Sequence, residues 1–203
     1  MSAARRLRHL VALLGALALL LSGAATATAA PTAPAAPAAS AALTGLDGTW
    51  SCSVPSGYVY DQVTQTGQCG SGSWPGPSYH LRTPVDGLTA CATAPGFVYD
   101  SVTGTTACDQ LGRTPTTTYR LRTPVDGMTA CATNPGWTYD LVTSTQTCSQ
   151  LSGVTATTYR LRIPVNGLWA CSVPSGWTYT STTTNYDCAY YRGSTATKYL
   201  LAH

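Results

Sequence analysis

The chain has 203 residues, of which 9% are charged, and it contains one Phe and no Glu. The chain has eleven Lys and Arg and eight acidic residues. Arg5, Arg6 and Arg8 lie at the N-terminus, so the rest of the chain has eight charges of each sign. This balance gives the remainder no general electrostatic attraction to nucleic acid or to anionic membranes.

Residues 1–29 have the pattern of a secretory signal peptide. The three Arg form a positively charged start, and residues 10–21 form an apolar run that is too short to span a bilayer. Ala27-Thr28-Ala29 then offers a cleavage site of small residues. We therefore expect a secreted protein that does not insert into a membrane and that is found outside the cell or at its surface.

Residues 30–42 are rich in Ala and Pro, a composition typical of an extended linker. The folded part is therefore expected to span residues 43–203. Arg greatly outnumbers Lys and Ala is frequent, which favours a bacterial source with GC-rich codons.

Eight cysteines recur at a fixed spacing in the folded part. The first Cys of each group is followed by the second after 17 residues, and successive groups start 39 or 40 residues apart. This regularity predicts four tandem repeats, with bounds near 43–82, 83–122, 123–162 and 163–203. A repeat of this size buries too little apolar surface to fold alone, so we expect stacking on neighbours and a covalent link within each repeat.

Export and an even number of cysteines predict four disulfides. The constant spacing favours pairing within each repeat: Cys52–Cys69, Cys91–Cys108, Cys131–Cys148 and Cys171–Cys188. The alternative joins the second Cys of one repeat to the first Cys of the next, which leaves Cys52 and Cys188 to close a ring. Zinc is disfavoured because no C-x-x-C pair is present.

Abundant Thr, Tyr and Val, without any apolar 3.6-residue period, predict an all-β fold. Residues 119–125 alternate in polarity and precede Asp126-Gly127, which predicts a type I′ hairpin to residues 128–133. A second hairpin is expected around Thr143-Ser144. Each repeat would then contain about four short antiparallel strands.

Two arrangements of the repeats remain open. Repeats 1 and 4 share an atypical segment, Trp50–Gly57 and Trp169–Gly176, and distinct terminal copies favour a stacked linear array with caps. The chain also ends on an extra strand-like copy, Lys198–His203, which could pair with repeat 1 and close a four-bladed, propeller-like ring. We expect the linear array, with the ring as the alternative.

The sequence offers little for catalysis. Beyond the signal peptide the only His are His80 and His203, and the Asp residues mostly recur at turn positions. No nucleophile elbow, zinc-protease or phosphate-loop motif is present. We therefore expect a protein that is not an enzyme and that uses neither cofactor nor metal.

Aromatic residues are the first candidates for ligand binding. After the turn Gly of each repeat comes a variable ring, and two residues later a Tyr that is present in all four repeats. The variable ring could stack on sugar rings, and the invariant Tyr is expected to pack inward. Packing of both rings is the alternative interpretation. The candidate stacking residues are Tyr58, Phe97, Trp137 and Trp177.

A repeated basic surface is the second candidate. If the repeats stack, these Arg residues would form a ladder that could bind carboxylate or phosphate groups of a cell-surface polymer. The favoured alternatives are an edge strand protected by charge, and pairing with nearby Asp. The residues are Arg82, Arg120, Arg122, Arg160 and Arg162, with His80 in the place of Arg120 in repeat 1.

These observations favour a secreted, non-enzymatic repeat protein that binds a glycan or cell-wall polymer. One alternative is an extracellular structural or protein-interaction repeat protein without a sugar site. A third is a secreted inhibitor or toxin. The sequence does not indicate an oligomeric state.

Overall fold

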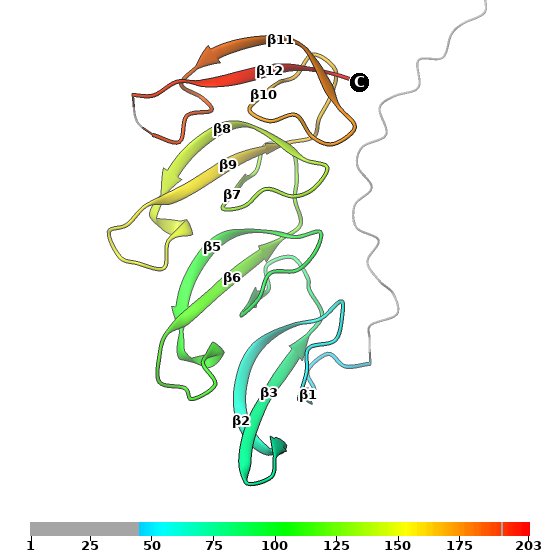
Figure 1. Ribbon diagram of the computed structural model, residues 1–203, viewed down its shortest axis with the longest axis vertical. Coiled ribbons are helices and arrows are strands. Elements are labelled where there is room, and N and C mark those ends of the chain that lie inside the picture. The colour runs from blue at the N-terminus through cyan, green and yellow to red at the C-terminus, as the bar shows by residue number, and fades with distance from the viewer. Residues whose placement is uncertain (1–44, 192) are drawn as a thin grey trace, which may run out of the picture. The chain divides into compact units, whose positions relative to one another are not determined.

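The computed structural model describes residues 45–191 and 193–203, so the predicted signal peptide and linker lie outside the described residues (Figure 1). The described chain is all-β apart from two short 3₁₀ turns. Its elements are β1 (Trp50–Ser51), β2 (Val59–Ser71), β3 (Trp74–Arg82), β4 (Thr89–Ala90), β5 (Val98–Thr105), η1 (Thr106–Cys108), β6 (Thr116–Arg122), β7 (Thr129–Ala130), β8 (Thr138–Thr145), η2 (Gln146–Cys148), β9 (Ala156–Arg162), β10 (Trp169–Ala170), β11 (Thr178–Asn185) and β12 (Ala196–Ala202).

The strands form four antiparallel sheets of three strands, one sheet for each repeat (Figure 1). In every sheet the strand that comes last in the sequence lies in the middle, with the orders β1-β3-β2, β4-β6-β5, β7-β9-β8 and β10-β12-β11. The expectation of four strands in each repeat was therefore wrong. We refer to the sheets in chain order as repeats 1 to 4.

The predicted hairpin at Asp126-Gly127 is also wrong. Strands β6 and β7 on either side of it belong to different sheets, so this turn is the crossover between repeats 2 and 3. Gly127 does have the expected positive φ of 79°. Its amide, however, donates to the Leu161 carbonyl at 2.8 Å, and the Asp126 carboxylate accepts the Ile163 amide at 2.8 Å. These bonds attach the turn to the central strand of the following repeat, β9.

The second predicted hairpin does not form either. Strand β8 continues through Thr143 and Ser144 and pairs with β9 along its length. It ends at Thr145, whose hydroxyl accepts the Thr147 amide at 3.2 Å and caps the turn η2. The turn then brings Cys148 back toward Cys131.

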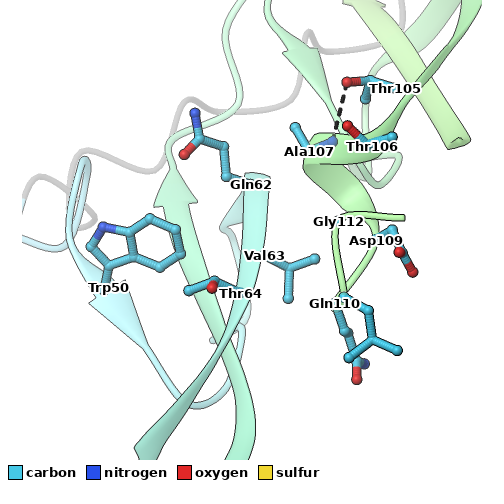
Figure 2. Close-up of a pocket in the computed structure, with 11 residues that line it drawn as sticks. Trp50, Gln62, Val63, Thr64, Thr105, Thr106, Ala107, Asp109, Gln110 and Gly112 are labelled. Carbon is cyan, nitrogen blue, oxygen red and sulfur yellow. Dashed lines mark hydrogen bonds between the residues drawn. The ribbon is translucent and has the colours of Figure 1, made fainter. Parts of the chain in front are cut away.

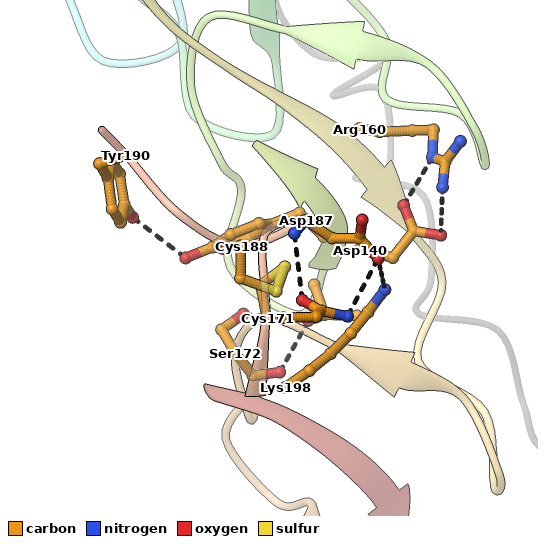
Figure 3. Close-up of a disulfide and its surroundings, with 11 residues drawn as sticks. Asp140, Arg160, Cys171, Ser172, Asp187, Cys188, Tyr190 and Lys198 are labelled. Carbon is orange, nitrogen blue, oxygen red and sulfur yellow. Dashed lines mark hydrogen bonds and ion pairs between the residues drawn. A yellow bond between two sulfur atoms is a disulfide. The ribbon is translucent and has the colours of Figure 1, made fainter. Parts of the chain in front are cut away.

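The four disulfides within the repeats are confirmed. Each joins cysteines 17 residues apart with a Cα–Cα distance of 5.1 to 5.5 Å. Figure 3 shows the bond of repeat 4, Cys171–Cys188, which links the residue after β10 to the segment after β11. Each bond closes a loop that contains the long strand. It lowers the conformational entropy of the unfolded chain, which in the loop-closure model stabilises the folded state by about 3 kcal/mol.

The core is built from small clusters that join neighbouring repeats. A Leu of each central strand is fully buried, at Leu81, Leu121, Leu161 and Leu201. Around Leu121 of repeat 2 pack Ala90 and Ala94 of the same repeat and Val59 of repeat 1. Val98 of repeat 2 enters the Leu161 cluster of repeat 3 in the same way. Repeats 2 and 3 thus each complete their core with a residue from the repeat before them.

A backbone hydrogen bond of 2.7 Å marks every junction. The amide of the first Cys donates to a Tyr carbonyl on the long strand of the preceding repeat, in the pairs Cys91–Tyr60, Cys131–Tyr99 and Cys171–Tyr139. The turns η1 and η2 also contact the preceding long strand, β2 and β5. The linear array is therefore confirmed. Among the described residues β12 pairs only with β10 and β11, so the alternative of a closed ring is not what the chain forms.

Candidate functional site

The variable aromatic rings that were predicted to stack on sugars lie largely against the protein. Tyr58 is 8% exposed, and its hydroxyl accepts the Leu46 amide at 3.3 Å. Phe97 and Trp137 are partly buried and pack on the Leu121 and Leu161 clusters. Trp177 is partly buried with its ring 5.1 Å from His203. Each of the four rings is therefore buried or partly buried.

The invariant Tyr of each long strand contacts the Tyr of the central strand edge to face. The pairs are Tyr60–Tyr79, Tyr99–Tyr119, Tyr139–Tyr159 and Tyr179–Tyr199, with ring centroids 4.9 to 5.1 Å apart. Burial raises the pKa of the Tyr60 and Tyr99 hydroxyls above the ordinary value. Such pairs contribute about 1 kcal/mol beyond the area they bury, so these rings stabilise the fold.

The Arg residues are held by carboxylates. Arg160 donates to Asp140 at 2.6 and 3.0 Å, and Arg162 donates to Asp140 at 2.8 Å and to Asp126 at 3.0 Å. Burial alone would raise the pKa of Asp140, but the bonds from both Arg outweigh it, so the pKa lies below its ordinary value. The guanidinium groups are thus already neutralised by internal partners.

A corresponding cluster occurs in repeats 1 and 2. Arg120 and Arg122 bind Asp100 in repeat 2, and Arg122 also binds Asp86. In repeat 1, His80 and Arg82 bind Asp61 at 2.6 and 2.8 Å. The predicted Arg residues are therefore brought together along the central strands, each beside an Asp. This geometry matches the pairing alternative for Arg82, Arg120, Arg122, Arg160 and Arg162.

Open grooves occur instead at two of the junctions between repeats. The first lies between β2 of repeat 1 and the segment that follows β5 in repeat 2, with a volume of about 470 Å³. Figure 2 shows Trp50, Gln62 and Thr64 on one side and the segment from Thr105 to Gly112 on the other. This groove is within the usual size range of small-molecule sites.

The first groove combines one exposed ring with neutral polar groups. Trp50 is 48% exposed, and its ring lies 5.2 Å from His80. Gln110 spans the junction, where its side-chain carbonyl accepts the Gln65 amide at 3.4 Å. Asp109, in contrast, is engaged with its own loop, whose amides at Arg113 and Thr114 lower its pKa.

The second groove lies at the corresponding place between repeats 3 and 4, with a volume of about 410 Å³. Its β8 side presents Thr143 and Ser144, and its other side presents three Tyr that are 50 to 80% exposed, Tyr186, Tyr190 and Tyr191. The Tyr190 hydroxyl lies 3.2 Å from the Tyr139 hydroxyl, which fixes this ring at the junction. All the described lining residues are uncharged: Val142, Thr143, Ser144, Tyr186, Ala189, Tyr190, Tyr191, Gly193 and Ser194.

The two grooves use equivalent positions of the repeat. Val63 of β2 and Val142 of β8 both lie 11 residues after the first Cys of their repeat, in the floor of a groove. The opposite wall is the segment around and after the second Cys of the next repeat. The sequence did contain a signal for this wall, because the residues after the second Cys vary between copies: GSGS, DQLG, SQLS and AYYR.

Comparison with protein-family models, with curated proteins and with solved structures finds no match to this chain. Among the residues that the structure describes, no helix is long and apolar enough to cross a membrane. Within the same residues, no three His, Cys or Asp side chains gather as possible metal ligands.

Proposed function

We propose that this is an extracellular, non-enzymatic repeat protein that binds a neutral polysaccharide of the cell exterior in its junction grooves. The observation that carries the proposal is that the same junction opens twice into a groove with exposed aromatic rings and mostly uncharged polar side chains; the Asp109 carboxylate of the first groove is bound to amides of its own loop. Four disulfides are in keeping with an oxidising, extracellular environment.

The groove chemistry suits a sugar chain. Sugar rings have an apolar C–H face that packs on an aromatic ring such as Trp50 or Tyr191, and their hydroxyls bond to amide and hydroxyl groups such as those of Gln62 and Thr64. A neutral polymer is favoured over a charged one because the Arg side chains of the central strands already bind Asp. The proposed ligand would therefore lie in a different part of the repeat from the Arg residues of the central strands.

Polymer pull-down with the purified, oxidised protein tests the proposal. Chitin and cellulose, both neutral, would be the probes, and Trp50→Ala and Tyr191→Ala the groove variants. Trp74→Ala is the matched control, because Trp74 is 81% exposed and lies outside both grooves. We expect at least one polymer to retain the protein, with about tenfold weaker retention of the groove variants.

Melting curves keep this test interpretable, since both groove rings are exposed and their removal should leave the fold intact. Retention on none of the polymers would contradict glycan binding and favour an extracellular structural or protein-interaction role. Equal loss in the Trp74→Ala control would show non-specific adhesion through exposed aromatic rings.

A further inference from the structure

The three internal junctions share one backbone contact but differ in the residue types that stand at two equivalent positions. At the first two, the long strand begins with a buried Val, at Val59 and Val98, and Ala follows the first Cys of the next repeat, at Ala92 and Ala132. At the third junction, Thr138 replaces the Val and Ser172 replaces the Ala. The pair therefore changes together, from apolar to hydroxyl.

The hydroxyl pair forms a specific contact. Thr138 is fully buried, and its hydroxyl donates to the Ser172 carbonyl at 2.8 Å and lies 3.0 Å from the Ser172 hydroxyl. Figure 3 shows Ser172 beside the disulfide of repeat 4. A Thr at this position of the strand is thus satisfied by a Ser after the first Cys.

The two ends of the array carry the two halves of the same contact. The long strand of repeat 4, β11, begins with Thr178, and Ser53 follows the first Cys of repeat 1. Both residues are exposed. Tyr179 is also 50% exposed, whereas its counterparts Tyr99 and Tyr139 in the internal repeats are partly buried. Within the described residues no fifth repeat follows Tyr179 to donate to its carbonyl.

The neighbouring residues also match. The segment Trp50–Gly57 of repeat 1 reads WSCSVPSG, and the segment Trp169–Gly176, which contacts β8 in repeat 3, reads WACSVPSG. Strand β11 (TYTSTTTN) has no charged residue and no Pro, so its edge lacks the usual protection against pairing with another chain. Every residue of β11 except Asn185 is exposed.

We propose that β11 of one copy receives the segment Trp50–Gly57 of a second copy, so that the array continues head to tail. The Cys52 amide would donate to the Tyr179 carbonyl, and the Thr178 hydroxyl to the Ser53 carbonyl, as Cys171 and Thr138 do internally. The two surfaces differ, so the contact is heterologous and can propagate into open chains.

This contact is weaker than an internal junction. In repeat 1 the strands β2 and β3 are joined directly at Gly72 and Ser73, and the 3₁₀ turn that contacts the preceding strand in repeats 2 and 3 is replaced by this hairpin. The contact between two molecules would therefore include the contact of the first Cys segment with the long strand, but not the contact made by the 3₁₀ turn. Association is expected to be reversible and to increase with protein concentration.

Sedimentation velocity of the purified, oxidised protein over a wide range of concentration tests the proposal. Ser53→Arg blocks one end and Thr178→Arg blocks the other, and both sites are exposed in the single copy, so both variants should keep the wild-type melting temperature. Val125→Arg, at a loop residue that is 55% exposed, is the charge-matched control. We expect wild type and control to associate and each end variant to associate about tenfold more weakly or worse.

Mixing the two end variants gives the decisive result. Each variant keeps one intact end, so the mixture should form dimers and nothing larger, at concentrations where each variant alone is largely monomeric. A two-fold symmetric contact would not show this rescue. The proposal is overturned if the wild type stays monomeric at every concentration, if either end variant alone associates like the wild type, or if the mixture forms no dimer.

Discussion

Asp140 and Arg160 are joined by two parallel hydrogen bonds of 2.6 and 3.0 Å, and the Asp140 side chain is only 8% exposed. Repeat 4 has Thr180 at the Asp position and Leu200 at the Arg position. Neither charge is kept without the other. The chain thus shows both a paired and an uncharged solution to the same packing position, in keeping with the cost of leaving one buried charge alone.

Asp140→Ala is expected to destabilise the protein by about 2 kcal/mol, measured by urea unfolding. The figure lies below that for a fully buried pair because Arg160 and Arg162 are 44% and 31% exposed and can be solvated in part. The loss arises because Arg160 loses its carboxylate partner and Arg162 keeps only Asp126.

Transplanting the residues of repeat 4 into repeat 3 provides the control. Replacing the whole cluster, with Asp140→Thr, Arg160→Leu, Arg162→Ala and Asp126→Asn, should recover most of the stability that Asp140→Ala loses. A cluster variant that is less stable than Asp140→Ala would contradict the view that the charges matter only as a set.

The same cluster predicts a fall in stability in acid. The pKa of Asp140 lies below its ordinary value in the folded protein, so its contribution is complete above the ordinary value and is lost as the pH falls through the folded value. The melting temperature should therefore be steady near neutral pH and decline below about pH 4. Asp86, whose pKa is lowered mainly by the Thr123 amide, adds to the decline. The cluster variant should decline less steeply than the wild type.

The periodic features of the fold could be predicted from the sequence. Equal Cys spacing gave the repeat number and the disulfide pairs, because a fixed spacing in a tandem repeat implies a fixed local geometry. The sheet topology could not be predicted. Asp126-Gly127 has the dipeptide of a hairpin turn, but hydrogen bonds to Leu161 and Ile163, far along the chain, make it a crossover.

The candidate site was predicted less well than the fold. Strand alternation could not show that Trp137 packs on a cluster shared by its own repeat and the preceding one, or that Tyr58 is buried. The grooves depend on how one repeat packs against the next. This packing includes contacts such as that of Gln65 with Gln110, which lie 45 residues apart in the sequence.

The two Trp positions should respond differently to truncation. Trp137 packs on the cluster of Val98, Ala130 and Leu161, so Trp137→Ala is expected to cost about 3 kcal/mol in unfolding free energy. Trp50 is 48% exposed, and Trp50→Ala should cost less than about 1 kcal/mol. Denaturant unfolding of both variants measures the difference. Equal stability of the two variants would mean that the Trp137 ring is a surface residue free to bind ligand.

Removal of one internal disulfide should destabilise the repeat that contains it. The double variant Cys131→Ala, Cys148→Ala opens a loop of this size and is expected to lose about 3 kcal/mol. Peptide mapping without reductant should still recover the other three pairs. A peptide that joins Cys69 to Cys91 would instead show the pairing between repeats that the structure excludes.

If both grooves bind the same polymer, they should act together on one chain. Two sites on one protein convert the second binding step into an intramolecular one, so a long polysaccharide is bound much more tightly than a short oligosaccharide of the same sugar.

Trp50→Ala and Tyr191→Ala each remove one exposed ring, from the first and second groove. Either variant alone should bring polymer affinity down toward oligosaccharide affinity, by tenfold or more, roughly 1.4 kcal/mol. Each single variant should bind through its one intact groove, and the double variant should lose binding altogether. Calorimetric titration with a graded series of chain lengths measures this. An affinity that does not depend on chain length, in a protein that still binds the sugar, would mean that only one groove is a site.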